Sequence, residues 1–296
     1  MSVSKKYVPF AVSFELNLYM KNTIHLILTL TVVFLILTPA IFAESKPDTT
    51  KIRTYPHLNK CIEQAYMASD SVRLDNGMLA EIAWLRENRT NCEFNSAVTR
   101  RLSLRLMELG DGQYGDEGLE IPIDRKKLFA ESLDWARIAV FEDSTDDINF
   151  ENLSMAFAAR LSVAGLRGKS LLADSIRMYA EKAVEINPDN HRAYHILGRW
   201  HYEVSKLSWI LRKLSKILFK HSPSGSFNLA VEYFNKAITL NDIPVHHYWL
   251  GMSYLESGKK QKALETFTYL LELEDDGLYN AQYFKERAKK LIKKHG

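Results

Sequence analysis

The sequence predicts an all-α protein in which antiparallel helix pairs stack into a superhelix. Breaker residues are few, because the 296 residues include only 13 Gly and 8 Pro, and turn-rich β folds need more of both. Apolar residues recur at three- and four-residue steps over most of the chain, which is the period of an amphipathic helix. The second half of the chain also repeats itself, as repeat architectures do.

Composition places the chain among globular proteins. Hydrophobic residues make up 46% of the sequence, which is enough for a sizeable core. The formal net charge is only +3, and so small an excess does not indicate a nucleic-acid partner.

The first element is an apolar segment, residues 24–42, that contains no Asp, Glu, Lys or Arg. Lys21 precedes the segment and Ala43 follows it, which is the arrangement of a secretory signal peptide. Residues 20–43 are therefore interpreted as a signal peptide that is cleaved before Glu44. We expect the mature protein to be exported, either to a periplasm or into the medium.

Two further points concern this segment, namely where the protein starts and whether the segment is cleaved. Met20 stands at a suitable distance to be the true start, so residues 1–19 are interpreted as an extension upstream of it. The alternative to cleavage is an uncleaved membrane anchor, because the apolar segment 24–42 is nearly long enough to span a bilayer.

Residues 44–56 are polar and predict a linker, and helical periodicity predicts an N-terminal helical region over 57–145. The helices expected in it are 57–69, 76–88, 93–109 and 124–142. The main break is the loop 110–118. The buried positions expected in the last of these helices are Leu128, Leu133, Trp135, Ile138 and Phe141.

This region holds both cysteines of the chain, Cys61 and Cys92. In an exported protein they can form one disulfide between two helices. The alternative is two unrelated buried thiols.

The helical pattern becomes regular over 146–296. The expected helix pairs are 151–165 with 171–186, 190–203 with 226–240, and 246–256 with 260–273. The final helix, 279–294, is amphipathic and basic, and we expect it to cap the open end of the array.

The repeat is carried by small and aromatic residues at fixed spacing. One repeat has Tyr194, Leu197 and Gly198, followed by Ala230, Phe234 and Ala237, and the next has His247, Leu250, Gly251 and Tyr254, followed by Ala263, Phe267 and Leu270. This spacing resembles the tetratricopeptide repeat (TPR). Gly198 and Gly251 would let paired helices approach closely, while the phenylalanines fill the space between them.

The first of these repeats exceeds the standard spacing by an insertion over about 203–225. Here the chain resembles the regulator of microtubule dynamics family, through LGRWHYEVSKLSW, the SPSGSF turn and the residues from Ala230 to Ala237. The resemblance extends weakly back to about 150 and forward to about 270. It implies an all-helical interaction protein without catalytic residues. It does not imply a microtubule role if the chain is exported.

A partner-binding surface is expected in the concave groove lined by first helices. The predicted residues are Arg160, Arg192, His195, Arg199, Tyr202, Tyr248, Trp249 and Met252. Arginines bind carboxylates bidentately and aromatic rings supply apolar contact, so the groove predicts a peptide or protein partner that can be acidic. The alternative is a solvated, salt-bridged face.

The inserted helix offers a second surface. Its basic-aromatic face contains Trp209, Arg212, Lys213 and Lys216, and it predicts docking to an acidic partner or to anionic lipid. The alternative is that Trp209 packs in the core. Membrane contact would then come only from residues 24–42.

Catalytic motifs are not found in the sequence, so we expect neither an enzyme nor a cofactor. His191 and His195 are four residues apart and could share a metal, but helix-start and groove positions explain both, and no metal is expected. An enzyme site in 57–145 would have to use the acids Glu81, Glu93, Asp134 and Glu142, which are not visibly paired. The sequence therefore predicts a non-catalytic interaction scaffold, or alternatively a membrane-tethered docking factor.

Overall fold

The computed structural model describes residues 60–91, 95–111, 123–207, 224–274 and 281–296, without the side chains of residues 166, 167, 170 and 171. All regular secondary structure within these ranges is α-helix. The helices are α2 (Lys60–Asn88), α3 (Ser96–Asp111), α4 (Arg125–Glu142), α5 (Asp147–Ser162), α6 (Leu166–Ile186), α7 (His191–Lys206), α9 (Phe227–Leu240), α10 (Pro244–Glu256), α11 (Lys260–Glu272) and α12 (Ala281–His295). The predicted all-α fold is confirmed.

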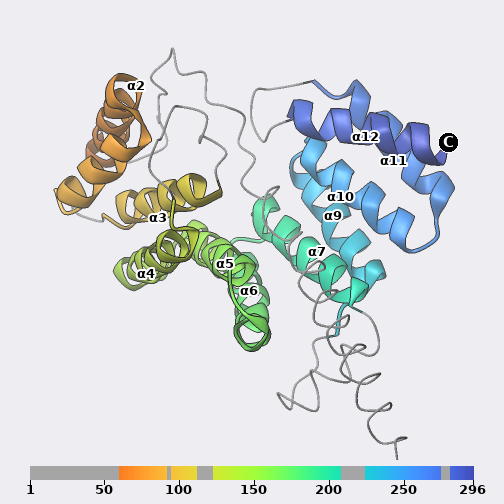
Figure 1. Cartoon of the computed structure of the whole chain (residues 1–296), viewed down its shortest axis with the longest axis horizontal. Coiled ribbons are helices and arrows are strands. Elements are labelled where there is room, and N and C mark those ends of the chain that lie inside the picture. Colours follow the sequence, from red (N-terminus) through yellow and green to blue (C-terminus); the bar gives the residue numbers. More distant parts are fainter. Residues whose placement is uncertain (1–59, 92–94, 112–122, 208–223, 275–280) are drawn as a thin grey trace, which may run out of the picture.

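The helices follow an arc from α2 to α12 (Figure 1). Each helix packs mainly on its neighbours in sequence, with α3 on α4, α5 on α6, α7 on α9 and α10 on α11. One core cluster joins residues of α3 to α7, and a second joins residues of α7 to α12. Because α7 contributes to both clusters, it links the two halves of the arc.

Four helix starts are fixed by a side chain that accepts a hydrogen bond from the first turn. The N-cap oxygens of Asp124, Asp146, Asn190 and Ser226 accept from the backbone N–H groups of α4, α5, α7 and α9. Such caps satisfy donors that the helix itself cannot pair. Helix α10 instead begins with Pro244, which has no N–H to leave unpaired.

Helix α2 is a hairpin of two helices joined at Gly77. Gly77 has φ of +81°, a conformation that side chains with a Cβ rarely adopt. The Oγ of Ser69 lies 3.1 Å from Oε1 of Glu81, whereas twelve residues of straight helix would span about 18 Å. The two halves therefore fold back on each other. Two helices are expected here, at 57–69 and 76–88, but residues 70–75 are helical and the turn lies at Gly77.

The predicted close approach at the two repeat glycines is confirmed. A Cβ built on Gly198 would lie 2.8 Å from the ring of Phe234, and one built on Gly251 would lie 2.4 Å from the ring of Phe267. Both phenylalanines are buried. Each glycine thus lets a phenylalanine ring of the second helix lie against the backbone of the first.

The same contact occurs in a pair that the sequence pattern does not predict. A Cβ on Gly110 of α3 would lie 2.3 Å from the ring of Phe129 of α4. The sequence places Gly110 in the loop 110–118, but α3 continues to Asp111. The residues after Gly110 are polar and glycine-rich and predict a loop, so the sequence pattern misses this helix pair.

The expected core face of α4 is partly wrong. Phe141 is 91% exposed, whereas the fully buried side chains are Phe129, Leu133, Ala136 and Ala139. At 100° per residue, Phe141 lies more than 100° round the helix from Phe129 and Ala136. Of the other predicted positions, Leu133 is buried while Leu128, Trp135 and Ile138 are half-buried.

The glycine contacts predict the result of enlarging those residues. Gly198→Leu and Gly251→Leu should each lower the free energy of unfolding by about 1–3 kcal/mol or more, because the added side chain meets a buried ring that cannot move away. Thermal and urea unfolding would measure the loss. Gly165→Ala is the matched control, since nothing lies within 4 Å of its built Cβ, and equal stability of all three variants would contradict the packing.

Candidate protein-interaction surface

The predicted groove residues all lie on α5, α7 and α10, which are the first helices of three successive pairs. Five of the side chains are buried, namely His195, Arg199, Tyr202, Tyr248 and Trp249. The other three are half-buried, namely Arg160, Arg192 and Met252. The expected set is therefore brought onto one series of helices, but much of it contributes to packing between repeats.

Arg199 makes its contacts inside the protein. Its side chain is 1% exposed, and its Nη2 donates to Oε1 of Glu203 at 3.3 Å. Its Cζ lies 3.4 Å from the ring centroid of Trp249 on α10, which is a close cation–π contact. Arg199 thus joins α7 to the next repeat and pairs with an acid one turn away.

Arg192 is also paired within the array. Its Nε lies 2.8 Å from Oε1 of Glu151 on α5, and its Nη2 lies 3.8 Å from Sδ of Met155. The Glu151 carboxylate is almost wholly buried, whereas the Arg192 side chain is 30% exposed. This contact links the first helices of two adjacent pairs.

Three histidines that are far apart in sequence form a hydrogen-bonded chain between α7 and α10. The Nδ1 of His191 lies 3.0 Å from Nε2 of His246, and Nδ1 of His246 lies 2.9 Å from Nδ1 of His195. Asn241 Nδ2 lies 3.3 Å from the other nitrogen of His191. Burial, followed by the Arg192 charge, lowers the pKa of His191 to about 4.

Burial likewise lowers the pKa values of His195 and His246 well below the usual value. The three rings are therefore neutral at neutral pH, and each can donate one hydrogen bond and accept another. Within the described ranges, no group of three or more His, Cys, Asp or Glu residues is arranged to hold a metal ion. The chain of histidines acts as a polar contact between α7 and α10.

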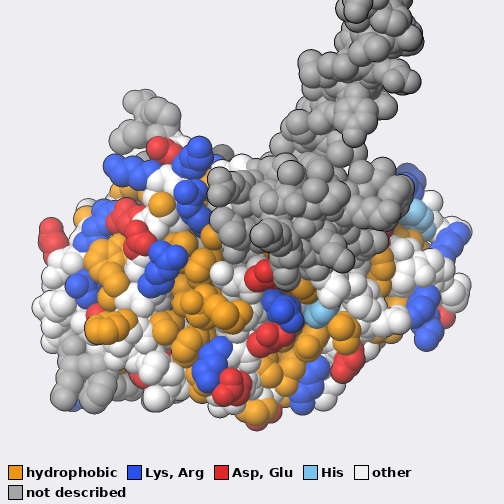
Figure 2. Space-filling model, turned by 90° about the horizontal axis from the view of Figure 1, so that it is seen from below, with side chains coloured by type: hydrophobic (Ala, Val, Ile, Leu, Met, Phe, Trp, Pro, Cys, Tyr) orange, Lys and Arg blue, Asp and Glu red, His pale blue; other side chains and the backbone are white. Residues whose placement is uncertain are grey.

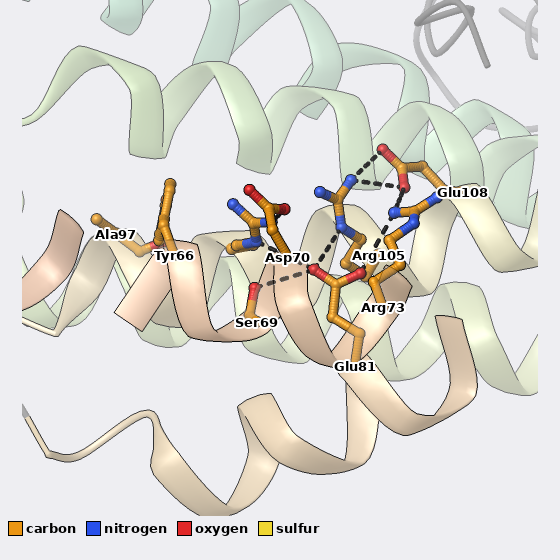
Figure 3. Close-up of polar contacts among 9 residues, drawn as sticks. Tyr66, Ser69, Asp70, Arg73, Glu81, Ala97, Arg105 and Glu108 are labelled. Carbon is orange, nitrogen blue, oxygen red and sulfur yellow. Dashed lines mark hydrogen bonds and ion pairs between the residues drawn. The ribbon is translucent and has the colours of Figure 1, made fainter. Parts of the chain in front are cut away.

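A second polar network holds the hairpin α2 on α3 (Figure 3). The Glu81 carboxylate is fully buried and accepts from Arg73 at 3.3 Å, Arg101 at 3.1 Å and Arg105 at 3.0 Å. Burial raises the pKa of Glu81, but the charges of Arg105, Arg101 and Arg73 outweigh it and lower that pKa to about 2. Glu81 is therefore ionised and has an acid–base role only in strong acid.

The remaining members balance the charge of this network. Glu108 accepts both 2.8 Å hydrogen bonds from Arg105 and one at 3.4 Å from Arg73. Asp70 pairs with Arg101, and Tyr66 donates to the carbonyl of Ala97 at 2.7 Å. The sequence does not predict this network, because its members are up to 35 residues apart in the chain.

The other acids considered for an enzyme site are paired as well. Glu142 accepts from Arg89 at 3.0 Å, and Asp134 accepts from Arg137 at 3.2 Å. Glu93 lies outside the described residues. The three acids that the structure describes each pair with arginine and do not gather at one place.

Several predicted features fall on residues that the structure leaves undescribed. These are the docking residues Trp209, Arg212, Lys213 and Lys216, together with Cys92 and the apolar segment 24–42. The Sγ of Cys61 lies 3.9 Å from the carbonyl oxygen of Asn91, the residue that precedes Cys92. The disulfide between Cys61 and Cys92 stays a prediction. Among the helices of the described ranges, none is long and apolar enough to cross a membrane.

The matched family confirms the resemblance seen in the sequence. The family model for regulator of microtubule dynamics protein 1-3 matches residues 69–296. The chain belongs to this family. The match begins within α2, so it includes Glu81 and its three arginines, whereas the sequence motifs alone supported the resemblance only from about 150.

Individual members of the regulator of microtubule dynamics family are similar to only part of this chain. Regulator of microtubule dynamics protein 1 of Mus musculus is 28% identical over 142 residues, which are 47% of this chain and 47% of that protein. Regulator of microtubule dynamics protein 3 of Xenopus laevis is 41% identical over 59 residues, which are 20% of this chain and 13% of that protein. The match thus spans about half the length of the Mus musculus protein and a smaller share of the Xenopus laevis protein.

A solved structure supports the fold. A thermophilic TPR protein of Thermus thermophilus superposes with a TM-score of 0.54, at 15% identity, over 77% of this chain and 97% of that protein. At this identity the likeness concerns the fold alone. It agrees with the TPR-like pairs found around Gly198 and Gly251.

The Glu81 network predicts how this family member responds to mutation. Glu81→Gln should lower the free energy of unfolding by about 3–5 kcal/mol, because it leaves buried arginines without their shared carboxylate. Urea unfolding would measure the change. Glu87→Gln is the matched control, since Glu87 is exposed on the same helix hairpin.

The network also predicts a pH dependence. Because the folded-state pKa of Glu81 is about 2 and its ordinary value is 4.5, its stabilising effect is complete above the ordinary value. It is lost as the pH falls through the folded-state value, and the shift corresponds to about 3 kcal/mol. A Glu81→Gln variant that unfolds like the wild type, at neutral and at acid pH, would show that the network does not hold α2.

Proposed function

We propose that this chain is a non-catalytic scaffold that binds a protein or peptide partner through the concave face formed by α5, α7 and α10. The observation that carries the proposal is the stacking of TPR-like pairs, which brings their first helices α5, α7 and α10 into one series. Stacked helix pairs form an extended concave surface that repeat proteins use for binding. Three side chains of this series are half-buried and keep some surface for a partner, namely Arg160, Arg192 and Met252.

A polypeptide partner suits these side chains. Arginine donates hydrogen bonds that main-chain carbonyl groups can accept, and methionine supplies adaptable apolar contact. The buried rings of Tyr202 and Trp249, with centroids 5.3 Å apart, hold α7 against α10 and so fix the surface that carries these side chains.

The arginines on this face favour specificity over a strong attraction to acids. Arg192 and Arg199 are already paired with Glu151 and Glu203, so the concave face has less unbalanced positive charge than its arginines suggest. An acidic partner would have to compete with these internal carboxylates.

A double variant tests the concave face. Arg160→Glu with Met252→Glu changes two half-buried side chains on α5 and α10 and should reduce capture of the partner at least tenfold, through lost apolar contact and added repulsion. The readout is affinity capture from a native extract, with bound proteins quantified by mass spectrometry.

The control introduces a glutamate on α6, which is the second helix of its pair and does not form the concave face. Met178→Glu alters a side chain on α6 that is 51% exposed, and it should leave capture unchanged. Circular dichroism should show equal helicity for all variants. Capture that is equal in the double variant and the control would move the partner site away from the concave face.

We also propose that the mature chain is exported, on the basis of the apolar segment 24–42 and its flanking residues. N-terminal sequencing of the mature protein should begin near Glu44.

Full-length protein recovered from membranes would instead support an anchor. In that case the chain would be a membrane-tethered docking factor, with Trp209 and the basic residues of the inserted helix as its contact. Export also decides whether the role named for the relatives can apply, because an exported chain does not meet cytoplasmic microtubules.

A further inference from the structure

The terminal helix α12 carries a concentration of positive charge that the concave face lacks. Residues 281–296 contain Lys285, Arg287, Lys289, Lys290, Lys293 and Lys294, but only one acid, Glu286. This excess is larger than the formal net charge of +3 for the whole chain. On the face of the molecule that Figure 2 shows, basic and acidic side chains are instead interspersed.

The fold determines which side of α12 faces outward. Ala281, Phe284 and Ala288 are buried, with the Phe284 ring 5.1 Å from that of Tyr248 on α10. At 100° per residue, Lys290 lies on the side opposite Ala281 and Ala288. Lys293 and Lys294 lie within one turn of it, on the same outward side.

Some of the cations on α12 are already engaged. Lys289 lies 2.9 Å from Glu286, and Lys285 donates to the carbonyl of Leu273. Arg287 donates to the hydroxyls of Tyr248 at 3.0 Å and Tyr283 at 2.6 Å.

The remaining three lysines differ from these. Lys290, Lys293 and Lys294 are exposed, and no acidic side chain in the described part of the chain lies within ion-pair distance of them. Within the described ranges, no ion pair therefore neutralises their charges.

The first turn of α11 extends this basic surface. Helices α11 and α12 pack on each other, and the contact of Lys285 with Leu273 places the start of α12 beside the end of α11. The two helices are therefore antiparallel, so the end of α12 lies toward the start of α11. That start carries three further exposed lysines, Lys259, Lys260 and Lys262.

We infer that the outward face of α12, with the first turn of α11, is a second docking surface that binds an acidic segment of a partner polypeptide. The inference rests on the proposed function as a protein-binding scaffold and gives it a surface outside the concave face. Charge complementarity carries it, because lysines on a fixed helix attract a row of carboxylates without first breaking internal ion pairs.

The side chains of α12 argue against two other polyanions as the partner, namely an anionic membrane and a single-stranded nucleic acid. An interfacial helix inserts apolar side chains into the membrane, whereas the apolar residues of α12 are already packed in the repeat array. Single-stranded nucleic acid is bound by stacking bases on aromatic rings, and residues 289–294 of α12, which carry the outward lysines, include no Phe, Tyr or Trp. A flexible acidic polypeptide needs neither feature.

The test uses the full chain and three lysine-to-glutamine changes, Lys290→Gln, Lys293→Gln and Lys294→Gln. The probe is fluorescent poly-L-glutamate, followed by anisotropy at low and at high salt. The wild type should bind it, the triple variant should bind about tenfold more weakly, and the difference should shrink as salt rises. Circular dichroism and thermal unfolding should be unchanged, because the three side chains are exposed.

The control removes the same number of charges elsewhere. Lys126→Gln, Lys127→Gln and Lys236→Gln alter exposed lysines of α4 and α9 and should leave poly-L-glutamate binding at the wild-type level. Vesicles of phosphatidylcholine with phosphatidylserine, and a duplex DNA oligonucleotide, serve as the other polyanions. Equal binding by both triple variants, or lysine-dependent binding only to vesicles or DNA, would overturn the inference.

This outcome is separable from that of the concave face. Arg160→Glu with Met252→Glu should leave poly-L-glutamate binding within about twofold of the wild type, because both substitutions leave the lysines of α11 and α12 in place and salt screens the added charges. If that variant keeps partner capture while the α12 variant loses poly-L-glutamate binding, the concave-face proposal fails and the α12 surface stands.

Discussion

The close contact between a glycine of one helix and a phenylalanine ring of the next is the constraint on which the array depends. It occurs at Gly110 with Phe129, at Gly198 with Phe234 and at Gly251 with Phe267. Any side chain at these glycines would separate the paired helices. The contact recurs in three of the helix pairs along the arc and gives these three a similar geometry, whereas α5 and α6 pack without it.

This constraint explains how much of the fold could be predicted from the sequence. Gly198 and Gly251 sit in a recognisable spacing, so the sequence predicts their packing correctly. Gly110 performs the same task, but the polar residues that follow it predict a loop instead. Phe141 is misplaced for a related reason, because the period of a helix gives the spacing of its core face but not which of several similar faces packs.

The polar contacts are harder to predict, since they join residues that only the fold brings together. The pairing of Arg199 with Glu203, four residues apart, follows from helical spacing. The pairings of Arg192 with Glu151 and of Glu81 with its arginines do not, because they depend on the packing of separate helices. Sequence reasoning therefore finds the helices that carry the candidate site, but not how far its charges are neutralised within the protein.

That neutralisation separates the two surfaces by mechanism. Ion pairs such as Arg192 with Glu151 link adjacent repeats, and disrupting this one would leave the buried Glu151 carboxylate unpaired. The concave face is thus suited to selecting a partner by shape and by hydrogen bonds made in fixed positions. Lys290, Lys293 and Lys294 of α12 form no ion pair within the described chain, so they can attract an acidic segment from a distance and with little geometric demand. A partner with an acidic segment beside a structured one could be attracted by the α12 surface and selected by the concave face.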